Sequence, residues 1–593
     1  MSAPNRNFLW TRVLVEELAR SGLRAVCIAP GSRSTPLTMA FAEYAADHPE
    51  LRLFPHMDER SAAFFALGVA LATDEPVALV CTSGSAAANF FPAIVEAHES
   101  RVPLLVLTTD RPPELRYSGA NQTIDQIKLY GDYALWSVDA PLPESQPAAL
   151  TVRALRTLAA RAYATADGIG AGGKKGVVHV NLPFRKPLEP IPVESDHTEI
   201  GAEAGEGYAG AFTVMTGGTV IPSVEQITTL VTILSQHERG IIVCGTKDLG
   251  ENFAAVVAQL SQRTGYPIFA DPSSGVRFGA HVENTAIIGA YDTFLSAPPT
   301  WDDPDVVIRF GGVPTSTALL AYLDKIKPHH RIQVSADGTW ADDSHRTALF
   351  VHADPTLLCL TLSGRLQARP ESQWAQRLRM VEAVTWLNIG QRLGDEFFDG
   401  AAVAALIDAL PDGANVFAGN SLPVRHVEQF ARPSTKHLHV FANRGASGID
   451  GNVSTALGIA AATRKPTVLL VGDITLYHDM NGLLAVNKCG VDNITVVLLN
   501  NDGGGIFHRL PVAKFEPPFT DWFVMPHGLQ FQHAAALYGL EYVHAEDEPV
   551  LRDALAFSIN ERSPLLIEVK TDAAHDDARR KQIQQMVTAS LQR

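Results

Sequence analysis

Short apolar runs alternate with longer segments of helical periodicity along most of the chain. The runs Ala25–Ala29, Val77–Cys81 and Leu104–Thr109 predict short buried strands. Further strand-like runs are expected at Val243–Gly250, Val306–Leu323, Val416–Asn420, Thr467–Asp473 and Ile494–Asn501. Strands that alternate with helices are typical of doubly wound α/β folds with parallel sheets. In such folds ligands bind at the carboxyl ends of the strands, and four of these runs end in Gly, Asn or Asp.

Two breaks in composition divide the pattern. The segment Glu189–Val220 is rich in Glu, Pro, Gly and Ala and is interpreted as a linker. A weaker break, Ser363–Trp374, is polar and contains Pro370. A chain of 593 residues is long enough for several cores. We therefore predict three α/β domains, near residues 1–190, 215–365 and 380–593.

Composition excludes several classes of function. The 48 Lys+Arg against 64 Asp+Glu give a net charge of −16, which opposes non-specific binding to nucleic acid or to an anionic membrane. The five cysteines form no Cys-x-x-Cys pair, so we expect a reducing, cytoplasmic environment. The longest uncharged apolar run, Ser61–Thr73, is too short to span a bilayer, so no integral membrane segment is expected.

The most specific motif lies in the third predicted domain. Gly472-Asp473 ends one apolar run, and Asn500-Asn501-Asp502-Gly503-Gly504-Gly505 ends the next. Asp473 and Asn501 are 28 residues apart, and a helix between the runs would return the chain to the same sheet edge. Carboxylate and amide oxygens suit Mg²⁺ shared with phosphate groups. Each piece alone is also typical of an ordinary turn.

Together, the two pieces resemble the cofactor motif of thiamine-diphosphate-dependent enzymes. The resemblance implies thiamine diphosphate with Mg²⁺, for which Mn²⁺ substitutes. It implies Asp473, Asn501 and the backbone carbonyl of Gly503 as metal ligands. Ile474 stands where many members have Gly, a departure that leaves these ligands unchanged. The three predicted domains would then be pyrimidine-binding, middle and diphosphate-binding domains.

A second motif, His56-Met57-Asp58-Glu59-Arg60, lies between a short strand and the expected helix Ser61–Ala72. Alone, it is also explained as a solvated helix cap, because acidic groups suit helix N-termini. The resemblance implies that Glu59 is the catalytic carboxylate that pairs with the aminopyrimidine ring of the cofactor. In the family this carboxylate and the diphosphate site come from different subunits. A homodimer or homotetramer with shared active sites is therefore implied.

Four further segments are similar to the carbon–carbon ligases of the menaquinone pathway. They are 29–36 (APGSRSTP), 109–115 (TDRPPEL), 119–122 (GANQ) and 443–451 (NRGASGIDG). This resemblance implies a transferase that decarboxylates 2-oxoglutarate and adds the succinyl carbanion equivalent to isochorismate, for menaquinone or phylloquinone biosynthesis. The alternatives are another thiamine-diphosphate 2-oxoacid decarboxylase or ligase, and a catalytically silent binding homologue. Retention of Glu59, Asp473 and Asn501 argues against the silent homologue.

Arginines at strand-end loops point to dicarboxylate substrates. They are Arg33, Arg111, Arg425 and Arg444. Surface ion pairing explains any one of them, but four in an acidic protein favour bidentate carboxylate binding. The resemblance implies that Ser32 and Arg33 contact the acceptor, and that Gln122, Ser421, Arg425 and Arg444 line the active site. It further implies that Ile449 supports the bent cofactor.

Some features limit the resemblance. Thr317 stands where many members have a lysine, so the share of the middle domain in acceptor binding is open. The segment Cys244–Gly250 lacks a full G-x-G-x-x-G, so FAD is not expected. Three histidines near the motifs are more simply explained as structural than catalytic. They are His56, His426 and His478.

Overall fold

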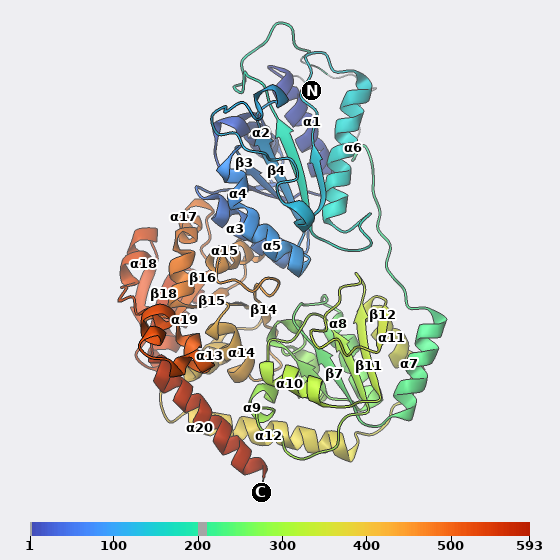
Figure 1. Cartoon of the computed structure of the whole chain (residues 1–593), viewed down its shortest axis with the longest axis vertical. Coiled ribbons are helices and arrows are strands. Elements are labelled where there is room, and N and C mark those ends of the chain that lie inside the picture. The colour runs from blue at the N-terminus through green and yellow to red at the C-terminus, as the bar shows by residue number, and fades with distance from the viewer. Residues whose placement is uncertain (1–2, 198, 200–209, 593) are drawn as a thin grey trace. The chain divides into compact units, whose positions relative to one another are not determined.

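The computed structural model describes residues 3–197, 199 and 210–592. The chain forms two compact units. The first unit comprises Met1–Gly218, Asn443–Arg464 and His478–Val491, and the second comprises Thr219–Ala442, Lys465–Tyr477 and Asp492–Arg593. Three six-stranded sheets carry the fold, and every paired strand in them is parallel (Figure 1). The prediction of three parallel α/β sheets is confirmed.

The sheet of the first unit has the order β2-β1-β3-β4-β6-β5. Its strands are β1 (Ala25–Ile28), β2 (Arg52–Pro55), β3 (Val77–Cys81), β4 (Leu104–Asp110), β5 (Ala134–Asp139) and β6 (Val177–Pro183). Alternate strand residues such as Val26 and Val80 pack against helices α1 (Arg6–Ser21), α2 (Thr35–Asp47) and α6 (Ala149–Ala166). Helices α3 (Glu59–Thr73) and α5 (Phe91–Ser100) contact strands of the same sheet. Because strand side chains alternate between faces, this sheet is covered on both sides.

Helix α3 packs closely against α15 (Asn452–Thr463) within the first unit, and the two lie side by side in Figure 1. Small residues allow this approach. A Cβ on Gly68 would lie 2.0 Å from the Thr455 carbonyl oxygen, and a Cβ on Gly458 would lie 2.1 Å from that of Phe65. Both distances are far below a van der Waals contact, so the glycines are required. The packing fixes α3, which begins at the candidate catalytic Glu59.

The middle sheet lies in the second unit and has the order β12-β11-β10-β7-β8-β9. Its strands are β7 (Gly240–Cys244), β8 (Ile268–Ala270), β9 (Ile287–Ile288), β10 (Val306–Phe310), β11 (His330–Ser335) and β12 (Leu349–His352). One face packs on α7 (Val224–Gln236), α8 (Phe253–Thr264) and α11 (Pro355–Arg365). The other packs on α9 (Tyr291–Phe294), α10 (Thr317–Lys325) and α12 (Gln373–Leu393). This sheet is therefore doubly wound as well.

The third sheet, also in the second unit, has the order β14-β13-β15-β16-β18-β17. Its strands are β13 (Asn415–Ala418), β14 (His439–Phe441), β15 (Thr467–Gly472), β16 (Ile494–Asn500), β17 (Glu541–His544) and β18 (Leu565–Lys570). One face packs on α13 (Asp399–Ala409), α14 (Leu422–Phe430), α19 (Glu548–Glu561) and α20 (Ala573–Leu591). The remaining helices are α4 (Ser85–Asn89), α16 (Asp473–His478), α17 (Ala485–Lys488) and α18 (Gln532–Tyr538).

Two predicted strand runs were partly wrong. In the run Val306–Leu323 only Val306–Phe310 is a strand, because a Gly-Gly-Val-Pro turn follows and Ser316 caps helix α10. In the run Val243–Gly250 the strand begins earlier, at Gly240, and ends at Cys244, because its pairing with β10 runs from Gly240 to Cys244.

The other boundaries follow the expectations less directly. The described part of Glu189–Val220 contains no helix or named strand, and residues 198 and 200–209 of the predicted linker lie outside the described residues. Each predicted domain range encloses one sheet, while the exact domain boundaries stay a prediction. Among the residues described, no helix is both long and apolar enough to cross a membrane.

Candidate active site

Asp473 lies where β15 ends, beside the end of the neighbouring strand β16. Its Oδ2 accepts hydrogen bonds from the backbone N–H groups of Asn501 and Gly503, both at 3.0 Å, and its Oδ1 accepts one from Ile474 at 2.7 Å. The side chain is only 4% exposed. Burial raises the pKa of Asp473, although these hydrogen bonds oppose the shift. A cation beside this carboxylate would stabilise its charged form.

Asn501 offers a further oxygen at the same sheet edge. Its Oδ1 is buried and has no hydrogen-bond partner in the described part of the chain. A buried acceptor without a partner is costly, so it indicates a missing ligand. The predicted pair of Asp473 and Asn501 therefore meets, and its chemistry fits a magnesium ion.

The glycines after Asn501 give the loop its shape. Gly503 has φ +144°, and a Cβ there would lie 2.2 Å from the Val524 carbonyl oxygen. A Cβ on Gly505 would lie 2.5 Å from Nδ2 of Asn501. Gly503 therefore excludes a side chain, and a side chain at Gly505 would displace that of Asn501. The loop keeps the backbone of Gly503 beside Asp473, as expected for a third ligand.

His527 also contacts this site, and sequence analysis did not single it out. Its Nε2 lies 3.4 Å from Oδ2 of Asp473. Its Nδ1 accepts the backbone N–H of Leu529 at 3.0 Å, so we assign the ring proton to Nε2, facing the carboxylate. The loop is held by Oδ1 of Asp502, which accepts the N–H groups of His527 and Gly528. No local pattern in the sequence signals this contact, because it depends on a long loop folding back.

Ser421 and Arg425 lie together after β13, the strand adjacent to β15. Ser421 has φ 73° and ψ −122°, an unfavourable conformation for a non-glycine residue. Such strain is common at functional sites. The Arg425 guanidinium donates from Nη1 to the Ser421 carbonyl at 2.6 Å. Ser421, Asp473 and Asn501 thus follow three adjacent strands, at one edge of the third sheet.

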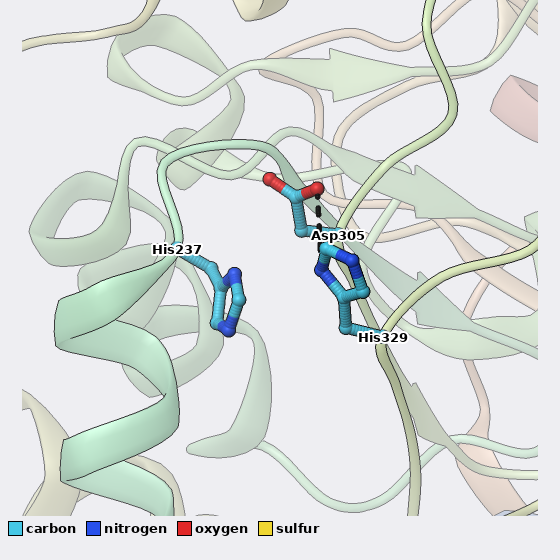
Figure 2. Close-up of side chains that lie close together, drawn as sticks. All are labelled: His237, Asp305 and His329. Atoms are coloured by element: carbon cyan, nitrogen blue, oxygen red, sulfur yellow. Dashed lines mark ion pairs between the residues drawn. The ribbon is translucent and has the colours of Figure 1, made fainter.

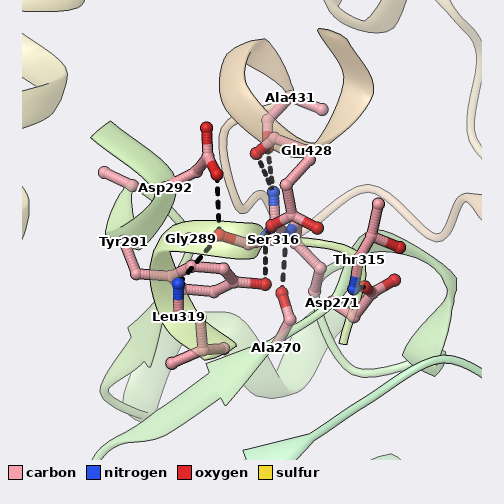
Figure 3. Close-up of polar contacts among 12 residues, drawn as sticks. Ala270, Asp271, Gly289, Tyr291, Asp292, Thr315, Ser316, Leu319, Glu428 and Ala431 are labelled. Carbon is pink, nitrogen blue, oxygen red and sulfur yellow. Dashed lines mark hydrogen bonds and ion pairs between the residues drawn. The ribbon is translucent and has the colours of Figure 1, made fainter. Parts of the chain in front are cut away.

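Helix α14, which carries Arg425, is anchored by a buried ion pair. Arg277 is fully buried and donates to Oε1 of Glu428 at 2.6 Å and to its backbone carbonyl at 2.8 Å. It also donates to the Ala270 carbonyl at 2.8 Å and to the Tyr291 hydroxyl at 3.0 Å. Burial raises the pKa of Glu428 to about 8, with Arg277 opposing the shift. Figure 3 shows Ala270 and Tyr291 near Glu428 and Ala431.

A neighbouring network fixes the loop before α10. The Ser316 hydroxyl donates to Asp292 at 2.6 Å and accepts the N–H of Leu319 at 3.1 Å (Figure 3). The N–H of Thr315 donates to Asp271 at 2.8 Å. Thr317, at the start of α10, is exposed. Polar contacts therefore hold the chain around Thr317, the position where many family members have a lysine.

The first unit contains a second cluster, at the carboxyl ends of β1, β3 and β4. Arg33 is buried and donates to the Phe184 carbonyl at 2.7 Å, and Arg111 donates to the Ser83 hydroxyl. Gln122 donates to the Ser83 carbonyl at 3.0 Å. Burial, followed by the charge of Arg111, lowers the pKa of Arg33. Two guanidinium groups near each other favour an anionic ligand.

Ser83 is the centre of this cluster, although sequence analysis did not select it. It follows β3, so the same strand-end rule would have identified it. Ser32 is exposed at the start of a short 3-10 helix, Ser32–Ser34. A Cβ on Gly31 would lie 2.3 Å from Cβ of Thr82, so the loops after β1 and β3 pack directly on each other.

Glu59 is the first residue of α3, which begins two residues before the expected helix Ser61–Ala72 and keeps Glu59 near the strand-to-helix junction. Asp58 caps the helix, because its carboxylate accepts the N–H groups of Arg60 and Ser61. Asn481 donates to the same carboxylate at 2.6 Å. Burial and the nearby Glu59 carboxylate raise the pKa of the Cys81 thiol, which places Glu59 near the end of β3. Asp58 is therefore the structural cap, which leaves the Glu59 carboxylate to another role.

The loop with Arg444 and Ile449 is held by Glu96 of α5, within the first unit. The Glu96 carboxylate accepts the N–H groups of Gly445, Ala446 and Ser447 at 2.7, 2.8 and 3.1 Å. Glu96 is only 3% exposed. Its position inside an apolar helix is a weak sequence signal, and its partners are far away in the chain. Glu96 is therefore a positioning residue that sequence analysis did not identify.

Two of the three histidines have clear structural contacts. The His426 Nε2 lies 2.9 Å from Oδ2 of Asp399, and both side chains are buried. Burial lowers the pKa of His56 to about 4, and its ring packs edge-on against Phe65 at 4.7 Å. His478 is exposed, and its backbone carbonyl accepts a hydrogen bond from Arg60. These contacts agree with structural roles for His56 and His426.

Comparisons with known proteins identify the class that this fold and these sites define. The family "Thiamine pyrophosphate enzyme, N-terminal TPP binding domain" matches residues 10–129, "Middle domain of thiamine pyrophosphate" matches 222–418, and "Thiamine pyrophosphate enzyme, C-terminal TPP binding domain" matches 424–569. The chain is a thiamine-diphosphate-dependent enzyme.

Relatives define the family more closely. A 2-succinyl-5-enolpyruvyl-6-hydroxy-3-cyclohexene-1-carboxylate synthase of Roseiflexus castenholzii is 56% identical over 99% of this chain and 100% of its own. Those of Haloarcula marismortui and Halobacterium salinarum are 44% and 42% identical, over at least 99% of each chain. The chain belongs to the family of these synthases, also called MenD, and the resemblance seen in the sequence is confirmed.

The anchoring role of Glu96 generates a prediction. Glu96→Ala leaves three backbone N–H groups of residues 445–447 without their acceptor, which costs about 1–3 kcal/mol for each group that stays buried. We expect faster amide hydrogen exchange at residues 443–451, with the free energy of unfolding reduced. Glu99→Ala is the matched control, because Glu99 is exposed on the same helix. Equal exchange in the two variants would contradict the anchoring role.

Proposed function

We propose that this protein decarboxylates 2-oxoglutarate and adds the succinyl unit to isochorismate. The product would be 2-succinyl-5-enolpyruvyl-6-hydroxy-3-cyclohexene-1-carboxylate, an intermediate for menaquinone or phylloquinone. The observation that carries the proposal is the buried oxygen pair of Asp473 and Asn501, in a chain whose relatives are synthases of this product. A silent binding homologue would have no reason to keep this pair.

The residues at the edge of the third sheet fit the cofactor. Thiamine diphosphate supplies a nucleophilic carbon and an electron sink for the decarboxylation. In our proposal Asp473, Asn501 and the carbonyl of Gly503 hold Mg²⁺, which balances the charge of the diphosphate. Nε2 of His527 lies 3.4 Å from Oδ2 of Asp473, so this ring would help to orient the carboxylate. Ser421 and Ile449 would contact the cofactor, as the resemblance implies.

The arginines divide between the two substrates in this proposal. Arg425, beside Ser421, would bind the distal carboxylate of 2-oxoglutarate. Arg33 and Arg111, which share the first-unit cluster with Gln122, would bind the carboxylates of isochorismate, with Ser32 at its exposed rim. Arg444 would complete the site from the loop that Glu96 holds. Guanidinium groups suit these roles because they pair with carboxylates bidentately.

Glu59 would exchange a proton with the aminopyrimidine ring of the cofactor, which prepares the reactive carbon. The family pattern implies that Glu59 serves a diphosphate site of a second subunit. We therefore propose a homodimer or homotetramer as the active form, in the cytoplasm.

The direct test is incubation of the purified protein with 2-oxoglutarate and isochorismate, with and without thiamine diphosphate and Mg²⁺. We expect the synthase product by mass spectrometry only when both cofactors are present. Release of succinic semialdehyde alone, with isochorismate left unchanged, would instead indicate a simple decarboxylase. No turnover of either substrate would refute both activities.

Loss of the Asp473 carboxylate, a proposed ligand of the metal, should strongly weaken cofactor binding. We predict that Asp473→Ala weakens Mg²⁺-dependent binding of thiamine diphosphate by more than about 100-fold, because even partners of metal ligands are worth roughly 10–100-fold. Isothermal titration calorimetry measures this change. Asp553→Ala, at an exposed position of α19, is the control. Unchanged affinity in Asp473→Ala would remove Asp473 from the metal site.

Glu59→Gln should fold and bind cofactor but lose turnover. The amide cannot exchange a proton, so we predict a decrease of roughly 10²–10⁴-fold in kcat, the usual contribution of an acid–base group. Steady-state kinetics provides the measurement. Glu75→Gln, just beyond the other end of α3, should retain full activity. Near-normal kcat in Glu59→Gln would show that this carboxylate is not catalytic.

The division of arginines predicts different effects on the two half-reactions. Release of carbon dioxide from 2-oxoglutarate alone reports the first, and product formation with isochorismate reports both. Arg425→Ala should impair both assays, and Arg33→Ala chiefly the second, each by roughly 10–150-fold, because a charge-assisted contact is worth about 1.5–3 kcal/mol. The reverse pattern would mean that donor and acceptor contacts are exchanged.

A further inference from the structure

Three polar side chains gather at the amino edge of the middle sheet, away from the strand ends used above. Asp305 directly precedes β10, His329 directly precedes β11, and His237 lies just before β7. These three strands are adjacent, in the order β11-β10-β7. Because parallel strands begin at the same edge, the fold itself brings the three side chains together.

The three side chains present their ligand atoms to one another. One ligand atom from each lies within 4.8 Å of the others. Nδ1 of His329 lies 3.6 Å from Oδ1 of Asp305, and the rings of His237 and His329 are 5.3 Å apart between centroids. Figure 2 shows His329 paired with Asp305 and His237 across from them. The cluster is partly open to solvent, since His329 is exposed, so an ion can reach it.

The chemical types of these ligands indicate which class of metal ion the cluster would bind. Two imidazoles and a carboxylate suit zinc and similar transition metals, whereas Mg²⁺ prefers oxygen alone. Ligand atoms around a tetrahedral zinc ion are separated by about 3.3 Å, given bonds of about 2.0–2.1 Å. Rotation of the exposed His329 imidazole to another rotamer can bring its ligand atom closer to the others.

Arg239 holds both oxygens of Asp305, so a bound ion would displace this guanidinium from the carboxylate. Arg239 donates to Oδ1 of Asp305 at 2.8 Å and to Oδ2 at 3.2 Å, and it also pairs with Asp302 at 3.0 Å. The second carboxylate, Asp302, keeps Arg239 paired when Asp305 binds an ion. Arg369 is directed to backbone carbonyls, including that of His237 at 2.7 Å.

We propose that His237, Asp305 and His329 bind one divalent transition-metal ion of the zinc class. The site is distinct from the Asp473 site, because it lies on another sheet and at its amino edge. A bound ion ties the beginnings of three adjacent strands together. It therefore stabilises the middle sheet by binding the folded chain in preference to the unfolded one.

The test uses the full-length protein saturated with thiamine diphosphate and excess Mg²⁺, which occupy the cofactor site. Zn²⁺ is titrated by calorimetry, and Co²⁺ is added separately to follow its visible absorption. We expect one Zn²⁺ per chain and a Co²⁺ spectrum typical of mixed nitrogen and oxygen ligands. His237→Ala and His329→Ala should each weaken Zn²⁺ binding by at least about tenfold, since lesser outer contacts are already worth that much.

The control variant is His48→Ala, because His48 pairs with one carboxylate, that of the exposed Glu50, and stacks on Tyr44. It should bind Zn²⁺ like the unmodified protein. Thermal unfolding provides a second readout, in which Zn²⁺ raises Tm in the unmodified protein and in His48→Ala but not in His329→Ala. Absence of Zn²⁺ binding, or equal binding by all variants, would overturn the proposal. Since His329 is exposed, its replacement should not prevent folding.

Discussion

The buried carboxylate of Asp473 is the constraint on which the candidate active site depends. Its charge is met by three backbone N–H groups and by His527, and burial still raises its pKa. The glycines after Asn501 allow the backbone to lie against this carboxylate without clashes. The unpartnered oxygen of Asn501 is a second buried oxygen at the same sheet edge. A cation resolves both features at once, because it pairs with the carboxylate and uses the amide oxygen.

The fold places the other candidate residues by the same rule. The first and third sheets have equivalent strand orders. The order reverses between β1 and β3 in the first sheet and between β13 and β15 in the third. Arg33 and Ser83 follow these strands in the first sheet, and Ser421 and Asp473 follow them in the third. The middle sheet has another order and carries none of the proposed catalytic residues. Topology therefore determines where sites form, and the side chains determine their chemistry.

Much of this arrangement could be predicted from local pattern. The strand Val77–Cys81 matches its apolar run, and the meeting of Asp473 with Asn501 follows from strands that end at one sheet edge. The prediction of one strand over Val306–Leu323 was partly wrong, because it was based on the apolar residues and did not consider the turn and the Ser316 cap.

Contacts between distant segments could not be predicted. Glu96 binds a loop 349 or more residues away, and Arg277 and Glu428 are 151 residues apart. Such pairs follow from tertiary packing and leave no periodic signal in the chain. They are nevertheless what holds the loop of Arg444 and the helix of Arg425 in place. Precise positioning of functional groups therefore depends on residues outside the recognisable motifs.

The central claim, that Asp473 and Asn501 hold the cofactor's metal, is tested most directly by anomalous scattering. Crystals of the protein grown with thiamine diphosphate and Mn²⁺ in place of Mg²⁺ would locate the ion without assumptions about its ligands. We predict one strong manganese peak roughly 2.0–2.3 Å from an oxygen of Asp473, from Oδ1 of Asn501 and from the Gly503 carbonyl. A cofactor-bound structure with manganese elsewhere, or with Oδ1 of Asn501 turned away from the ion, would contradict the account.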